Sequence, residues 1–275
     1  MGIDYHALKF LTYARNRTRF GAVATIGRQG LHLPPWRVER ILGLPAAVDY
    51  GPYCEPLLID QFGADLVHSY DNSDYERATH IADLGRALTP TNIYDTVIDA
   101  GCLEHVYDAP QALRNLSGLT KVGGQILHIL PANGFCGHGF WQFSPELFFA
   151  LYSEENGYAD TEVFLAELAD EACWYRVKKP AHGKRAEVLT RGEAYALVRT
   201  RRVRAEATPI VQQSDYVHAW QRASRDERPP TLVERPVARV SVLRWMARLS
   251  YRQIRDKLRR RSLSRAHPCL TRVAI

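Results

Sequence analysis

Acidic and imidazole side chains follow a short apolar run near the middle of the chain. Residues 96–98 are typical of a buried strand, and Asp99, Glu104 and His105 come directly after them. In parallel sheets, ligands bind at the carboxyl ends of the strands, where the loops open onto one edge. A histidine titrates near neutral pH and can move a proton during a reaction. We therefore expect Glu104 and His105 to be catalytic or binding groups.

A second candidate group follows the next apolar run, in the segment 133–143. His138 lies there between two glycines, with the aromatic residues Phe135, Phe140 and Trp141 nearby. Glycines let a loop approach a ligand closely, and aromatic side chains can form the wall of an acceptor pocket. His138 is therefore a third candidate catalytic residue. The alternative is an ordinary loop whose aromatic residues join the core.

The elements that must position these groups form a strand–helix–strand unit over residues 94–131. Apolar residues at helical spacing (Ala112, Leu113, Leu116 and Leu119) lie between the strand at 96–98 and a second apolar run at 125–130. We expect Gly123 and Gly124 to end the helix. A crossover of this kind predicts two neighbouring parallel strands.

The rest of the chain continues this alternation. Further strands are expected at residues 20–26, 64–70, 79–84, 161–168 and 195–203, and helices at residues 4–15, 36–44, 55–62, 144–155 and 237–261. The pattern predicts a doubly wound α/β fold with a mostly parallel seven-stranded sheet, a C-terminal antiparallel hairpin and a basic C-terminal helix. We expect one domain over residues 1–206, followed by a polar linker and helical extension over 207–275.

Composition limits the class of protein. The 275 residues are 46% hydrophobic and carry a net charge of +6, with no apolar run near the roughly 20 residues of a membrane span. Five scattered cysteines without a CxxC pair fit a reducing cytoplasm better than a disulfide framework. The basic excess gathers between Arg235 and Arg265. Such a segment suits nucleic acid, anionic lipid or acidic glycan, or forms a solvated helix face.

The order of these features resembles a class I S-adenosylmethionine-dependent methyltransferase, and most of all the small-molecule "type 11" group. The resemblance covers about residues 22–203. Its most specific parts are YDTVIDAG followed by LEHV, and the Gly123-Gly124 pair before the next strand. The stretch GFCGHGFWQFSPELFF is similar to a bacterial subgroup associated with glycan or natural-product tailoring.

The resemblance implies a site for S-adenosylmethionine at the carboxyl edge of the sheet. Its residues would be Gly27, Arg28, Gln29, Asp71, Asp83, Leu84, Asp99 and Gly101. The glycine loop would meet the methionine part, Asp71 the ribose hydroxyls, and Asp83 with Leu84 the adenine. Asp99 and Gly101, which follow the strand at residues 96–98, would lie under the sulfonium. His105 would face the acceptor as its base.

The reaction expected from this resemblance is O-methylation of a small molecule or a sugar. One alternative is methylation of RNA or a glycolipid, held by the basic tail. Another is a non-catalytic scaffold, because the loop Thr25-Ile26-Gly27-Arg28-Gln29-Gly30 lacks the usual acid and third glycine. The long separation between Gly27 and Asp71 indicates either an insertion over residues 31–53 after the first strand of the sheet or altered cofactor binding. The sequence also leaves a homodimer open.

A metal-dependent site is a further alternative. Glu104, His105 and His138 are similar to a divalent-metal pattern found in some quinone and RNA 2′/3′-end methyltransferases. That pattern has another Glu three positions before the Glu-His pair, and Gly101 occupies this position here. The sequence therefore favours a site without a metal ion.

Overall fold

A nine-stranded mixed sheet forms the centre of the molecule. The computed structural model describes residues 2–180, 186–205, 209–225, 261–262 and 268–275. The strand order is β13-β9-β8-β11-β7-β6-β2-β4-β5. The strands are β2 (Gly21–Ile26), β4 (Ala64–Asp71), β5 (His80–Ile81), β6 (Tyr94–Asp99), β7 (Thr120–Asn133), β8 (Tyr158–Glu167), β9 (Cys173–Val177), β11 (Ala194–Arg202) and β13 (Leu270–Ala274). The strands β7, β6, β2, β4 and β5 pair in parallel with one another. The strands β13, β9, β8 and β11 pair antiparallel, and β11 is also antiparallel to β7.

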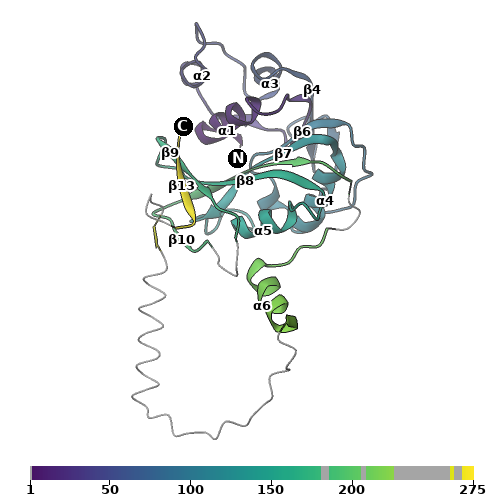
Figure 1. Cartoon of the computed structure of the whole chain (residues 1–275). Helices are drawn as coiled ribbons and strands as arrows, with labels where there is room; N and C mark the ends of the chain where they lie inside the picture. Colours follow the sequence, from purple (N-terminus) through teal and green to yellow (C-terminus); the bar gives the residue numbers. More distant parts are fainter. Residues whose placement is uncertain (1, 181–185, 206–208, 226–260, 263–267) are drawn as a thin grey trace, which may run out of the picture.

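Helices cover both faces of this sheet (Figure 1). On one face lie α1 (Tyr5–Arg15), α2 (Pro35–Leu42) and α3 (Glu55–Phe62), and on the other lie α4 (Ala109–Leu119) and α5 (Pro145–Leu151). The remaining elements are α6 (Ser214–Arg225), the short 3-10 helix η1 (Leu103–His105), and the two-stranded pairs β1 (Gly2–Ile3) with β3 (Gly30–Leu31) and β10 (Val188–Leu189) with β12 (Arg261–Ser262). Among the described residues, no helix combines the length and apolar composition needed to cross a membrane.

Polar side chains begin the helices on either side of the candidate site. Asp108 accepts a hydrogen bond of 3.0 Å from the Gln111 amide at the start of α4, and Ser144 accepts one of 3.2 Å from the Glu146 amide at the start of α5. Each bond pairs an amide that has no partner within the helix. The cap expected at Ser144 is confirmed, but α5 ends at Leu151, before the expected limit at residue 155.

The expected crossover is confirmed, because β6 and β7 are parallel neighbours with α4 between them in the chain. The glycine pair does not end the helix, however. Helix α4 stops at Leu119, and Gly123 and Gly124 lie within β7. A Cβ atom at Gly124 would stand 2.9 Å from the carbonyl oxygen of Asp95 on β6. The glycine therefore permits close strand contact.

The predicted count of seven strands is wrong. All seven expected strands are in the sheet, and β8 and β11 are antiparallel neighbours as expected. Two more strands, β9 and β13, extend the antiparallel side. Strand β13 comes from the end of the segment assigned to the C-terminal extension. Of the basic helix expected at residues 237–261, residues 237–260 lie outside the described residues, and Arg261 belongs to β12.

Candidate active site

Strand register gathers the candidate residues at one edge of the sheet. Ile26 at the end of β2 lies opposite Tyr70 on β4 and Asp99 on β6. The Gly27 amide, one position further, donates a hydrogen bond of 2.7 Å to the Tyr70 carbonyl. The glycine loop, the end of β4 and η1 therefore meet at the carboxyl edge, as the sequence predicts for a ligand site.

Asp99 lies beneath η1, with its carboxylate buried. It accepts hydrogen bonds from the amides of Cys102 and Leu103 at 3.1 and 3.3 Å, and contacts Nδ1 of His128 at 2.9 Å. Nε2 of His128 lies 2.7 Å from the Tyr152 hydroxyl. Both carboxylate oxygens thus have protein partners, and Asp99 holds the turn that carries the candidate catalytic residues. Gly101, with φ at +91°, lies within this turn.

Sequence reasoning missed His128. It lies fully buried within the apolar run of β7 and is directly opposite Asp99 in the register. A histidine inside such a run was the available signal, because a buried polar ring requires a hydrogen-bond partner. Only the pairing of β6 with β7 identifies Asp99 as that partner.

Glu104 is the central side chain of the site. Its side chain is fully buried, and neither carboxylate oxygen has a hydrogen-bond partner. Burial, with repulsion from Asp99, raises the pKa of Glu104 to about 8, although its own backbone amide acts in the opposite direction. A buried carboxyl group without a partner is costly, which makes this position a candidate for binding a ligand.

The two candidate histidines converge on this carboxylate. Nε2 of His105 and Nε2 of His138 lie 3.8 and 3.7 Å from Glu104 Oε1, and the two ring centroids are 5.1 Å apart. Their side chains are 49% and 41% exposed, so both rings border solvent. Burial, together with the charge of His138, lowers the pKa of His105. The structure thus brings together all three predicted catalytic residues.

The loop after β7 is fixed to η1 by its backbone. The amides of Phe140 and Trp141 both donate to the Glu104 carbonyl, at 2.6 and 3.3 Å. Gly139 has a φ of +72°, and a Cβ atom there would lie 2.7 Å from the same carbonyl oxygen. Phe135 stacks on Tyr195 with ring centroids 5.5 Å apart. This aromatic contact anchors the loop to β11 and places His138 beside Glu104.

The glycine loop and Asp71 form the second part of the site. Gly27 has a φ of +73°, and a Cβ atom there would lie 3.6 Å from Cys102, next to η1. Asp71 makes only long contacts, of 3.4 Å each, with the amides of Arg28 and Ser73. Gln29 is buried, and its Oε1 has no hydrogen-bond partner. Asp71 and Gln29 therefore retain acceptor oxygens for a ligand.

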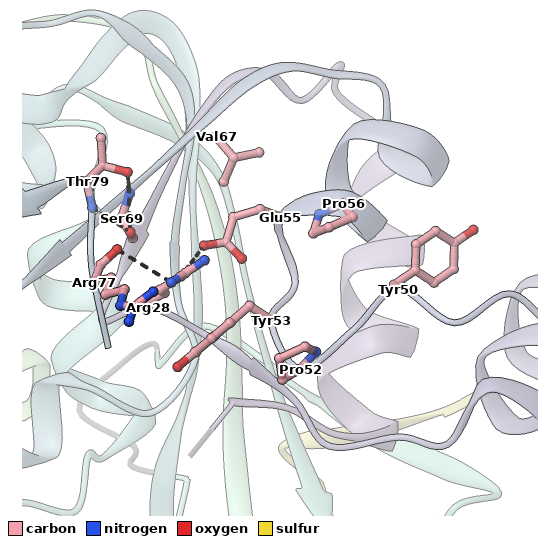
Figure 2. A pocket seen from close by; sticks show the side chains of 10 residues that line it. All are labelled: Arg28, Tyr50, Pro52, Tyr53, Glu55, Pro56, Val67, Ser69, Arg77 and Thr79. Carbon is pink, nitrogen blue, oxygen red and sulfur yellow. Dashed lines mark hydrogen bonds and ion pairs between the residues drawn. The ribbon is translucent and has the colours of Figure 1, made fainter. Parts of the chain in front are cut away.

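The Arg28 side chain extends from the glycine loop into a cavity of about 380 Å³. Figure 2 shows it between Glu55 and the backbone of Arg77, above the ring of Tyr53. Its Nε lies 2.7 Å from Glu55 Oε1, and its guanidinium carbon is 3.9 Å from the centre of the Tyr53 ring. The side chain is thus held by protein groups, and only the Arg28 backbone contacts Asp71.

The two expected adenine-binding residues differ in exposure. Asp83 is exposed, accepts a hydrogen bond of 2.9 Å from the Gly85 amide, and forms an ion pair with Arg86. Leu84 is buried in the core, and its carbonyl accepts from the Asn115 side chain at 2.9 Å. Of these two side chains, only that of Asp83 is open to a ligand.

The chain matches no family model and no curated protein. It is similar in fold to phosphoethanolamine N-methyltransferase 2 of Haemonchus contortus in complex with S-adenosyl-L-methionine, at 14% identity and a TM-score of 0.40, over 58% of this chain and 38% of that one. It therefore spans well under half of that protein. A possible histamine N-methyltransferase from Thermotoga maritima matches at 14% identity with a TM-score of 0.39, and the match covers 71% of this chain and 88% of that one. YcgJ of Bacillus subtilis matches at 11% identity with a TM-score of 0.41, and the match covers 74% of this chain and 100% of that one.

Proposed function

We propose that this chain is an S-adenosylmethionine-dependent methyltransferase acting on a hydroxyl group of a small molecule or a sugar. The observation that carries the proposal is the meeting of the glycine loop, Asp71 and the Glu104–His105–His138 group at one edge of the parallel strands. Such an edge can hold a nucleoside cofactor beside an acceptor. The proposal rests on this geometry, since the similarities above have low identities and TM-scores.

The residues around Gly27 fit the cofactor. The positive φ at Gly27 favours glycine on this turn, which lies beside Cys102. Asp71 can accept hydrogen bonds from two ribose hydroxyls, since its present contacts are long. Gln29 offers an unpartnered oxygen. When bound, S-adenosylmethionine supplies an electrophilic methyl group, and its transfer to a hydroxyl forms one C–O bond, breaks one C–S bond and releases a proton.

The acceptor would lie against Glu104 and the two histidines. The exposed rings of His105 and His138 can orient a hydroxyl by hydrogen bonding, and in this scheme the ring of His105 takes up its proton. Exposed aromatic side chains border the site, since Phe140 and Trp141 are 67% and 40% exposed. Such rings suit the apolar faces of a sugar or another cyclic acceptor. Alignment of donor and acceptor is then the main contribution of the protein.

The test is calorimetric titration of the full chain with S-adenosylmethionine and S-adenosylhomocysteine. We expect binding by the wild type and a loss of roughly tenfold or more in Asp71→Ala, because charge-assisted hydrogen bonds are worth about 1.5–3 kcal/mol. Asp65→Ala is the matched control, since Asp65 lies at the other end of β4 and pairs with Arg19 on the surface. Absence of binding by the folded wild type would contradict the proposal and favour a non-catalytic scaffold.

A further inference from the structure

Three side chains that commonly bind metal ions point toward one another in the candidate site. One donor atom each from Glu104, His105 and His138 lies within 4.8 Å of the other two. They come from two segments far apart in the chain, η1 and the loop after β7. The backbone bonds of Phe140 and Trp141 to the Glu104 carbonyl hold these segments together. The arrangement therefore does not depend on the mutual attraction of the three side chains.

The spacing is suited to a shared ion and too long for direct hydrogen bonds. Glu104 Oε1 is 3.7 and 3.8 Å from the two imidazole nitrogens, beyond normal hydrogen-bond length. Two ligands of a tetrahedral ion are roughly 3.4 Å apart when each lies about 2.1 Å from it. The two distances from Glu104 Oε1 to the imidazole nitrogens are only slightly longer than this value.

Two of the three side chains also carry buried atoms without a hydrogen-bond partner. Both oxygens of the fully buried Glu104 and Nε2 of His138 are buried without a hydrogen bond. Buried polar atoms in proteins are nearly always paired, and an exception requires an explanation such as a bound ion. A cation between the three side chains would give one oxygen of Glu104 and Nε2 of His138 a shared partner.

We propose that Glu104, His105 and His138 bind a divalent transition-metal ion. Two imidazole nitrogens and one carboxylate oxygen form a ligand set for ions such as Zn²⁺ or Fe²⁺, and do not suit Mg²⁺ or Ca²⁺, which prefer all-oxygen sites. Three protein ligands leave coordination positions open, as in catalytic metal sites. This inference replaces the expectation from the sequence that the site holds no metal ion.

The role of the ion rests on the proposed function. An acceptor hydroxyl bound at an open position would lose its proton to water more readily, because the cation stabilises the alkoxide. The oxygen would then be held at a fixed place beside the methyl donor, with no change in oxidation state. In this arrangement the imidazole of His105 would be a metal ligand. The ion would act as a Lewis acid, and the proton of the hydroxyl would pass to water and not to His105.

The experiment uses the untagged full chain after treatment with a chelator. Zn²⁺ binding is measured by competition with a chromogenic chelator, and Co²⁺ binding by its visible absorption. The variants are Glu104→Gln and His138→Gln, which nearly preserve side-chain size. The matched control is His80→Gln, which removes an imidazole from edge strand β5 and leaves η1 intact. Circular dichroism and thermal unfolding without metal establish that each variant is folded.

We expect one Zn²⁺ per chain for the wild type and for His80→Gln. Glu104→Gln and His138→Gln should weaken binding by at least the roughly 10–100-fold that loss of an outer-shell partner costs, and should change the Co²⁺ spectrum. Folded variants that bind Zn²⁺ as the wild type does would overturn the proposal, as would a wild type that binds none.

Cofactor titrations on the same preparations separate this inference from the proposed function. Glu104→Gln should still bind S-adenosylhomocysteine, and Asp71→Ala should still bind Zn²⁺. Zn²⁺ binding without any cofactor binding would contradict the methyltransferase proposal and leave the metal site standing. If the wild type instead transferred a methyl group at full rate after chelation, the ion would have no role in catalysis.

Discussion

Asp99 and His128 form a fully buried pair, with Oδ2 of Asp99 2.9 Å from Nδ1 of His128 across neighbouring strands. The same carboxylate accepts the amides of Cys102 and Leu103, so the pair supports the turn from which Glu104 and His105 project. The candidate site is thus connected to the centre of the sheet by one hydrogen-bonded unit.

Replacement of His128 by Leu should destabilise the protein by about 1–3 kcal/mol, because the buried carboxylate of Asp99 loses a partner. Urea denaturation measures this as a fall in the free energy of unfolding. The control is Tyr152→Phe, which removes only the hydroxyl 2.7 Å from His128 Nε2 and should cost about 0.5–1.5 kcal/mol. Equal costs for the two variants would show that the contact with Asp99 contributes little.

Two glycines of the loop after β7 provide a matched test of the loop geometry. Both have positive φ, but a Cβ atom would lie 2.7 Å from the Glu104 carbonyl at Gly139 and would meet nothing within 4 Å at Gly137. Gly137→Ala should cost about 1–2 kcal/mol of unfolding free energy from backbone strain alone. Gly139→Ala should cost more and should also weaken Zn²⁺ binding, because it pushes the loop away from η1. The prediction fails if both variants bind Zn²⁺ equally well.

The Arg28 side chain should be structural, with an indirect effect on cofactor binding. It pairs with Glu55 and stacks on Tyr53 (Figure 2). It also donates a hydrogen bond to the Glu76 carbonyl. Arg28→Ala should lower the unfolding free energy by about 1–3 kcal/mol, because these partly buried partners are left unpaired. Arg28→Lys should recover only part of the lost unfolding free energy, because an ammonium group lacks the planar array of donors of the guanidinium group. Full stability in Arg28→Ala would show that these contacts contribute nothing.

Stability in acid should depend on Asp95, at the opposite edge of the sheet from the site. Burial alone would raise the pKa of Asp95, but hydrogen bonds from the Ala22 amide and Lys121 outweigh it and lower that pKa below its ordinary 3.8. A carboxyl group with a lowered pKa stabilises the folded state above its unfolded pKa. This contribution should disappear as the pH falls from about 4 through the lower pKa that Asp95 has in the folded protein.

Asp95→Asn should therefore flatten the dependence of stability on pH in that acidic range. Thermal unfolding of wild type and variant from neutral to acidic pH measures the difference. Asp65→Asn is the control, because its ion pair with Arg19 is exposed. Parallel pH profiles for wild type and Asp95→Asn would contradict the prediction.

The sequence by itself determined the central crossover and selected the three candidate catalytic residues. A short apolar run, a helix with apolar residues at helical spacing and a second run suffice to predict β6, α4 and β7, because these signals are local. The acid and histidines at the ends of such strands point to a site, since loops at the carboxyl edge face the ligand. Glu104, His105 and His138 could be selected in this way.

Only the tertiary structure decided how these residues meet. The distances between Glu104 and the two histidines depend on the backbone bonds between η1 and the loop after β7. The partnership of Asp99 with His128 depends on strand register, which side chains far apart in the chain fix together. The place of β13 beside β9 likewise follows from pairing over a long sequence separation. Such contacts depend on packing of the whole chain, and local sequence patterns do not encode them.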